Sequence, residues 1–194
     1  MNTPMKVAVV EAERDRALMI VDGLREAGDY DVTVIGDASS LERRLAELRP
    51  DVVLIDLSDP NRDTLEQLAV ASGPTQRPVA MFVDRSDSAI TRMAIDAGVS
   101  AYVVDGFRKE RVKPILDAAI ARFQLFTRMR TELEATKSAL AERKVIERAK
   151  GLLMKAKGLG EEEAYALLRK TAMDQGRKVA DVAQSLVTAA DLLS

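Results

Sequence analysis

The feature that most constrains the fold is a regular alternation of short apolar runs with longer amphipathic segments over the first 104 residues. The apolar runs cover residues 6–10, 31–35, 51–57, 78–83 and 100–104, and they have the length and β-branched content of strands. Helical periodicity lies between them, over residues 14–27, 39–48, 62–71 and 86–97. Gly28 and Gly98 end two of these helices, and Ser39 or Ser40 is available to cap another. Five strands joined by helices predict a parallel, doubly wound α/β sheet.

No strand signal follows residue 104. Residues 109–157 have the pattern of one helix, and Pro114 lies near its start, where proline is tolerated. Gly158 and Gly160 end it, and further helices are predicted over residues 161–174 and 179–193. Their inner faces are small or apolar: Ala164, Leu167, Leu168, Thr171 and Ala172, then Val179, Val182, Ala183, Leu186, Val187 and Ala190. We predict an α/β domain over 1–120, a connecting helix over 121–142, and an all-α three-helix unit over 143–194.

The connecting helix carries a short apolar seam. Phe126, Leu133 and Leu140 are seven residues apart, and Met129 follows Phe126 by three. This spacing is typical of a coiled coil. The alternative is that the seam packs on its own domain, but about 50 helical residues are too many to lie against one small domain. A contact between two copies of the chain is therefore the favoured interpretation.

Composition excludes several classes of protein. The chain has no Cys and no His, which excludes disulfides, thiolate nucleophiles, His-based acid–base catalysis and the usual zinc sites. No apolar run is long enough to span a membrane, and no signal segment precedes the first strand. We expect a cytoplasmic protein without membrane contact. Acidic residues outnumber basic ones over residues 1–120, and basic residues outnumber acidic ones over 121–194, which directs any nucleic-acid partner to the second part.

Three acidic residues are predicted at the carboxyl edge of the sheet. Glu11 and Glu13 follow the first strand, and Asp56 ends the third. In sheets of this kind, ligands bind at that edge near the point where the strand order reverses. Grouped carboxylates can hold Mg²⁺, and an aspartate can accept a phosphoryl group. We expect no resident cofactor beyond weak Mg²⁺ binding at this acidic pocket.

The segment VVLIDLSDP around Asp56 resembles the phosphoacceptor strand of two-component receiver domains, and the resemblance covers about residues 5–120. It implies a receiver-like, flavodoxin-like fold with Asp56 as the phosphoacceptor equivalent. The sequence departs from the family at two positions, since Asp84 stands where receivers have Ser or Thr and Asp105 where they have Lys. Asp56 is either phosphorylated or kept for folding and partner contacts. The two departures favour the second interpretation, because the hydroxyl and the ammonium that would bind an acyl-phosphate are missing, and the carboxylate in place of the ammonium repels a phosphoryl group.

Basic residues are frequent between residues 143 and 178. Lys144, Arg148 and Lys155 can share one helix face, and such a face can neutralise phosphates. A charged stripe is more often only solvated, so this signal alone is weak.

The segments IERAKGLLM (146–154), EAYALLRKTA (163–172) and VADVA (179–183) resemble the ANTAR module over about residues 125–190. Members of that family bind paired RNA hairpins in a nascent leader transcript and prevent a terminator from forming. The resemblance implies RNA contacts by basic side chains of this unit: Lys144, Arg148, Lys150, Lys155, Arg169 and Lys170. Tyr165 could stack on a loop base, although a core position is the favoured interpretation. Ala149, Ala164 and Ala172 are predicted close-packing positions.

Residues 81–84 and 101–106 resemble one subgroup in particular, the nitrate and nitrite assimilation antiterminators of the NasT type. That resemblance implies a nitrate-binding, NasS-like sensor protein that sequesters the regulator. Three alternatives stay open. In the first, phosphorylation of Asp56 activates RNA binding. In the second, the chain is a DNA-binding response regulator, although the last helix has too few basic residues for that role. An enzyme acting through carboxylates is the least supported, since no nucleophile or substrate pocket accompanies them.

Overall fold

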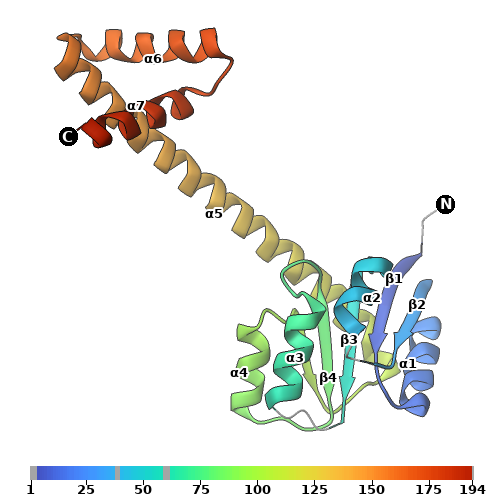
Figure 1. Ribbon diagram of the computed structural model, residues 1–194. Helices are drawn as coiled ribbons and strands as arrows, with labels where there is room; N and C mark the ends of the chain where they lie inside the picture. The colour runs from blue at the N-terminus through green and yellow to red at the C-terminus, as the bar shows by residue number, and fades with distance from the viewer. Residues whose placement is uncertain (1–3, 38–39, 59–61, 194) are drawn as a thin grey trace. The chain divides into compact units, whose positions relative to one another are not determined.

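The computed structural model describes all residues except 1–3, 38–39, 59–61 and 194. Its first part contains a sheet of five parallel strands in the order β2-β1-β3-β4-β5 (Figure 1). The strands are β1 (Met5–Val10), β2 (Tyr30–Ile35), β3 (Val52–Leu57), β4 (Val79–Val83) and β5 (Ala101–Val104). The order reverses between β1 and β3, which pair in register with Val10 opposite Ile55. The carboxyl ends of β1 and β3 therefore meet at the edge where ligands bind in such sheets.

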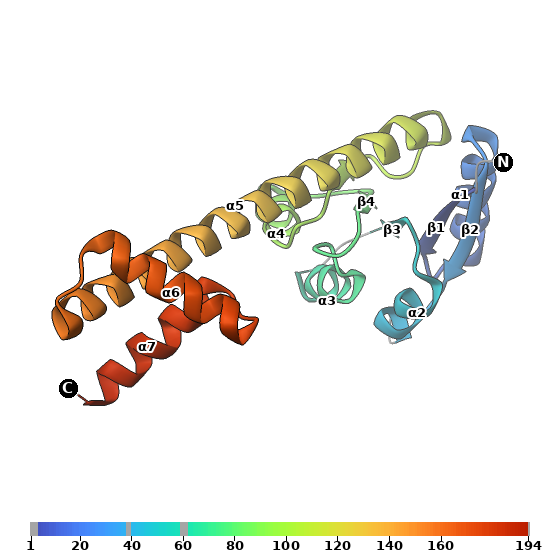
Figure 2. The same ribbon diagram turned by 90° about the horizontal axis from the view of Figure 1, so that it is seen from above.

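Helices cover both faces of the sheet (Figure 2). On one face lie α2 (Leu41–Leu48), α3 (Arg62–Ser72) and α4 (Ser88–Asp96), and on the other lie α1 (Arg14–Ala27) and the first turns of α5 (Lys109–Lys157). The central strands β1, β3 and β4 are largely buried on both faces, and their side chains contribute to two separate apolar clusters. Gly23 of α1 allows close packing, since a Cβ there would lie 2.8 Å from Lys109 Cβ and 2.9 Å from the Phe107 ring.

The chain divides into two compact units, Met1–Arg128 and Met129–Ser194. The second unit consists of the end of α5 with α6 (Glu161–Gln175) and α7 (Val179–Leu193). These three helices share one apolar core, whose fully buried members include Ala149, Ala164 and Ala183. Gly176, with φ of +61°, ends α6 in the left-handed conformation that glycine adopts readily.

The predicted fold class is confirmed: a five-stranded parallel α/β domain, a long helix and a C-terminal helical unit. The bounds of α1, α5 and α7 agree with the sequence pattern, and most other ends differ by one or two residues. The expected cap of α2 is wrong for Ser40, whose side chain makes no capping hydrogen bond; Ser39 lies outside the described residues. Asp87 caps α4 instead, accepting hydrogen bonds from the N–H groups of Ala89 and Ile90. Within the described part of the chain, no helix is both long and apolar enough to cross a membrane.

Candidate functional site

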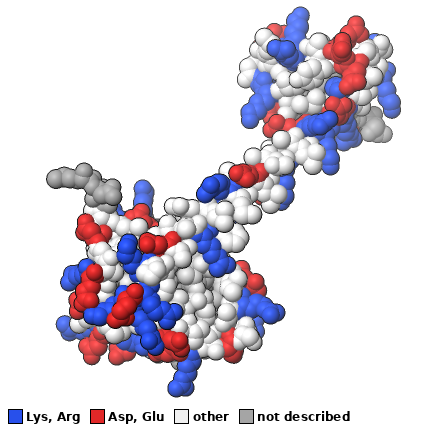
Figure 3. Space-filling view, turned by 180° about the vertical axis from the view of Figure 1, so that it is seen from behind, with Lys and Arg blue, Asp and Glu red and all other residues white. Residues whose placement is uncertain are grey.

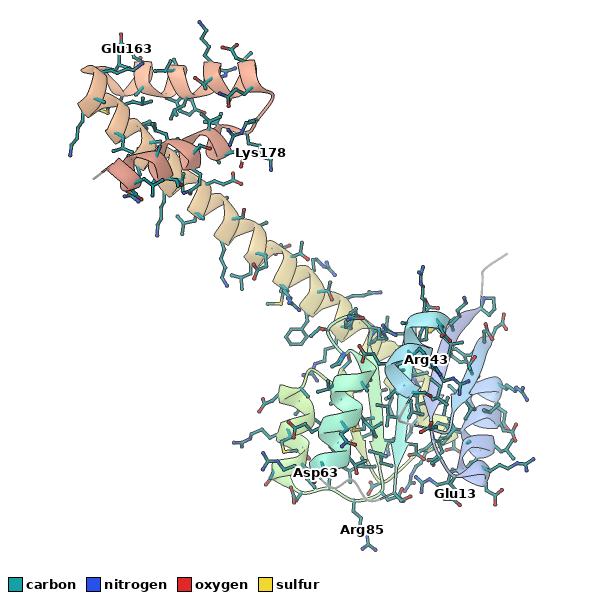
Figure 4. The ribbon with its side chains drawn as sticks, viewed as in Figure 1. Glu13, Arg43, Asp63, Arg85, Glu163 and Lys178 are labelled. Carbon is teal, nitrogen blue, oxygen red and sulfur yellow. The ribbon has the colours of Figure 1, made fainter. Side chains whose placement is uncertain are left out.

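The first candidate site lies at the carboxyl edge of the sheet. Glu11 directly follows β1, and Asp56 lies near the end of the neighbouring strand β3. Both are buried, and Asp56 is only 2% exposed. The structure thus brings together two of the three predicted acidic residues. Glu13 lies at the same edge (Figure 4), but its side chain is exposed, and only its backbone N–H takes part, donating to Glu11 Oε1 at 2.8 Å.

A guanidinium joins these carboxylates. Arg16, in the first turn of α1, lies with Nη2 2.7 Å from Asp56 Oδ2 and Nε 3.3 Å from Glu11 Oε2. Its Nη1 lies 2.9 Å from Oδ2 of Asp84, which follows β4. The resemblance to receiver domains had marked Asp84 as a departure near the phosphoacceptor, but the sequence analysis did not include Arg16. Arg16 is 40 residues from Asp56, and no sequence pattern marks it as part of the pocket.

The pKa values in this cluster follow from burial and from the guanidinium. Burial raises the pKa of Asp56 from 3.8 to about 6, although the hydrogen bonds and positive charge of Arg16 act in the opposite direction. The pKa of Arg16 is raised, first by its hydrogen bond to Asp84 and then by Asp56. Arg16 therefore stays charged at all relevant pH values, whereas Asp56 loses its proton less readily than an ordinary aspartate does.

Weak Mg²⁺ binding at the acidic pocket stays a prediction, and Arg16 already lies against two of its carboxylates. Divalent cations of this kind take several oxygen ligands, and no group of three or more acidic, His or Cys side chains among the described residues is arranged to hold one. The positive charge beside Asp56 comes instead from Arg16.

The second candidate site is the surface of the helical unit, where basic and acidic side chains are interspersed (Figure 3). Lys150 is only 7% exposed. Its Nζ lies 2.9 Å from Glu147 Oε1 and 2.6 Å from Glu161 Oε1, at the start of α6. These hydrogen bonds, first Glu147 and then Glu161, raise the pKa of Lys150. Lys150 thus connects the end of α5 to the start of α6. This structural role was not part of its prediction, which was contact with RNA.

Arg148 is also paired, since its Nη2 lies 2.6 Å from Asp191 Oδ1 on α7. The other basic residues predicted to contact RNA are exposed, and within the described part of the chain no salt bridge involves their side chains: Lys144, Lys155, Arg169 and Lys170. Arg169 lines a groove of about 570 Å³ that also contains Arg177 and Lys178. Lys178, which precedes α7, is labelled in Figure 4. The apolar residues Ile146 and Ala172 and the acidic residue Glu142 also line this groove.

Two predictions for individual residues of this unit have different outcomes. Ala149, Ala164 and Ala172 are buried in the core, which confirms them as close-packing positions. Tyr165 is 44% exposed and lies outside that core, so its interpretation as a core residue is wrong. Its ring remains available for stacking.

The seam on α5 is exposed along its length. Phe126, Met129, Leu133 and Leu140 are each more than half exposed. Arg122 lies over the Phe126 ring, 5.5 Å from its centroid. The alternative that these residues pack on their own domain is wrong. A helix face with four large exposed apolar side chains is typical of an interaction surface.

Comparison with known proteins assigns both units. Residues 134–187 match the ANTAR domain family. The transcriptional regulatory protein PdtaR of Mycobacterium tuberculosis is 31% identical over 182 residues, which are 93% of this chain and 88% of that protein. The DNA-binding response regulator MtrA of Mycolicibacterium smegmatis is 28% identical over 117 residues, about half of its own length.

Solved structures show the same fold in the first unit. The signal receiver domain of the response regulator NarL from Mycobacterium tuberculosis matches with a TM-score of 0.52 and 21% identity, over 61% of this chain and 98% of that one. The receiver domain of Klebsiella pneumoniae RstA matches with a TM-score of 0.51 and 22% identity, over 59% of this chain and 97% of that one. A receiver-like domain precedes an ANTAR domain here, and the similarity to PdtaR spans both. The chain belongs to the family of ANTAR-domain response regulators.

Proposed function

We propose that this regulator binds paired hairpins of a nascent leader transcript through its ANTAR domain and prevents a terminator from forming. The observation that carries the proposal is the set of exposed cations without a salt bridge in the described helical unit, together with the ANTAR match over residues 134–187. Paired cations are already neutralised by the protein, whereas Lys144, Lys155, Arg169 and Lys170 are available for phosphates. Such a protein works where transcripts are made, in the cytoplasm.

Two copies joined along the seam of α5 would present two such units. Each unit would hold one hairpin, and binding of the first raises the effective concentration of the second. RNA helices are recognised mainly by shape and backbone, and sequence is read in their loops. The groove beside Arg169 and the exposed ring of Tyr165 offer apolar surface next to cations, which suits an unpaired base near a phosphate.

The proposal is tested by binding of the intact protein to a two-hairpin leader RNA and to duplex DNA across a salt series. We expect tight binding to RNA only. Lys155→Ala or Lys170→Ala should reduce the slope of log K against log salt by about 0.7–0.9 for each lost phosphate contact. Lys137→Ala is the matched control, because Lys137 lies on the same helix α5 and is already paired with Glu134. Equal binding to duplex DNA, or an unchanged slope in both variants, would contradict the proposal.

The narrower assignment to nitrate and nitrite assimilation rests on the resemblance of residues 81–84 and 101–106 to that subgroup. In this scheme a nitrate-binding sensor protein holds the regulator in a form that cannot bind RNA, and nitrate releases it. Co-purification of the two proteins without nitrate, and their separation with nitrate, is the expected result. Retention of the complex at saturating nitrate would contradict this assignment without affecting RNA binding.

Phosphorylation of Asp56 is the second candidate mode of control, favoured by its position near the end of β3 in a receiver fold. Against it, one Asp56 oxygen contacts Arg16, and the other is buried without a hydrogen-bond partner in the described structure. Treatment with acetyl phosphate separates the two modes. Only phosphorylation-dependent control predicts a change of oligomeric state.

A further inference from the structure

The carboxylate pocket of the receiver-like domain already contains a cation that belongs to the chain. Arg16 contacts three carboxylates that come from the ends of three adjacent strands: Glu11, Asp56 and Asp84. Asp56 has a fully buried side chain, and Arg16 itself is 20% exposed. A guanidinium is always charged and can donate to several oxygens at once. It can therefore serve as a permanent counter-ion at this edge of the sheet.

We infer that Arg16 is the built-in counter-ion of this pocket, and that a divalent cation binds there only when the guanidinium is removed. The two would compete for the same atoms, since Arg16 contacts Asp56 Oδ2 and Glu11 Oε2. A metal ion ligated by these oxygens would lie close to the guanidinium, and two cations that share the same carboxylate oxygens repel each other.

The position of Arg16 is fixed from a third side by Asp84. Asp84 contacts Nη1 at 2.9 Å, and its own carboxylate lies tightly against the loop after β5. A Cβ at Gly106 would lie 2.6 Å from Asp84 Oδ1, and Gly106 has a φ of +70°. A side chain at residue 106 would therefore have to displace the Asp84 carboxylate from its present position. Asp84 thus adds a third contact to the two that hold the guanidinium at Asp56 and Glu11.

Two buried oxygens show what the pocket would hold without Arg16. Asp56 Oδ1 and Glu11 Oε2 accept no hydrogen bond in the described structure. Removing the guanidinium would leave three carboxylates near one another without a cation, two of them with unpaired buried oxygens. Buried charges of one sign are strongly unfavourable unless a cation compensates them. The pocket should then gain affinity for Mg²⁺ or Mn²⁺.

The inference is tested by titrating the full chain with Mn²⁺ and following the free ion by electron paramagnetic resonance. We expect Arg16→Gln to bind one Mn²⁺ at least about tenfold more tightly than the unmodified chain, a difference that corresponds to 1.4 kcal/mol. Arg14→Gln is the matched control, since Arg14 is an exposed arginine at the start of the same helix. Adding Asp56→Asn to Arg16→Gln should abolish the gained binding, which locates the ion.

Several results would overturn the inference. Arg16→Gln could bind Mn²⁺ no more tightly than the unmodified chain, or Arg14→Gln could show the same gain. A measurement on the unmodified chain decides the matter even if Arg16→Gln fails to fold. We expect micromolar Mn²⁺ to leave the amide NMR signals of Glu11 and Asp56 unbroadened, and selective broadening of both signals at that concentration would show that the pocket binds the ion with Arg16 in place.

Discussion

Replacing Asp56 by Asn removes a charge that the fold of the receiver-like domain buries at a cost. Burial raises the pKa of Asp56 from 3.8 to about 6, so the folded protein binds a proton more tightly at this site than the unfolded chain does. The folded state is then relatively favoured at low pH and loses stability as the pH rises from about 4 to about 6. One pKa unit corresponds to about 1.4 kcal/mol, which gives a cost on the order of 3 kcal/mol above pH 6.

The Asn variant avoids this cost because it cannot ionise. Its amide oxygen can still accept the hydrogen bond from Arg16 Nη2, which lies 2.7 Å from Asp56 Oδ2. Its NH₂ group takes the place of Oδ1, a buried atom without a partner in the described structure, and an unpaired amide there offsets part of the gain. We therefore expect Asp56→Asn to raise the free energy of unfolding by about 1–3 kcal/mol at pH 8 and to leave it nearly unchanged at pH 4.

Urea unfolding followed by tyrosine fluorescence measures this difference. Tyr30 and Tyr102 lie in the receiver-like unit and Tyr165 in the helical unit, so a Tyr165→Phe background makes the signal report the first unit only. Glu66→Gln is the control for removing an exposed carboxylate from the same unit. The reasoning would be refuted if Asp56→Asn had a lower free energy of unfolding than the unmodified chain at pH 8. It would also be refuted if the difference in free energy of unfolding between the two proteins were the same at pH 4 and pH 8.

Three further substitutions test the packing, the helical unit and the seam. Gly23→Ala should lower the free energy of unfolding of the first unit, measured with urea, by about 1–3 kcal/mol, because its Cβ would lie 2.9 Å from the Phe107 ring. An unchanged free energy of unfolding would contradict the close packing of α1 on Phe107. Lys150→Met should lower the melting temperature of the helical unit, measured by calorimetry, since it leaves Glu161 without its cation at 2.6 Å. An unchanged melting temperature would mean that this ion pair does not contribute to stability. Leu133→Glu should abolish self-association in sedimentation equilibrium, because it places a charge in the exposed seam; association equal to that of the unmodified chain would exclude the seam as the dimer contact.

The elements of the fold were predictable because their signals are local. Continuous β-branched runs such as residues 51–57 mark strands buried on both faces, and the structure places β3 there at Val52–Leu57. Glycines mark helix ends with similar clarity, as at Gly158 after α5. Ser40 shows where a local rule fails. Its backbone, with φ of −109° and ψ of 10°, lacks the extended conformation of an N-cap, so its hydroxyl makes no capping hydrogen bond.

The candidate sites were only partly predictable, because their decisive contacts connect distant parts of the sequence. The position of Asp56 follows from its strand, but Arg16 reaches it only because the strand order places β1 beside β3. Lys150 has the spacing of an exposed basic residue on α5. It is buried because the chain turns at Gly158 and returns with Glu161, which accepts its hydrogen bond. Charge alone does not distinguish such a residue from one that is free for RNA.

The internal pairing of Arg16 has a consequence for how the regulator is controlled. A signal changes RNA binding only if it favours one state of the protein over another, and a large shift requires several kcal/mol of differential affinity. A pocket that already contains a cation of the chain offers less of this to a metal ion or a phosphoryl group, since Arg16 makes three ion pairs there. The seam of α5 has no such obstacle, because its apolar side chains are already exposed. Under the proposed function, a second copy of the chain that covers the seam would supply the required difference without breaking any of the Arg16 ion pairs.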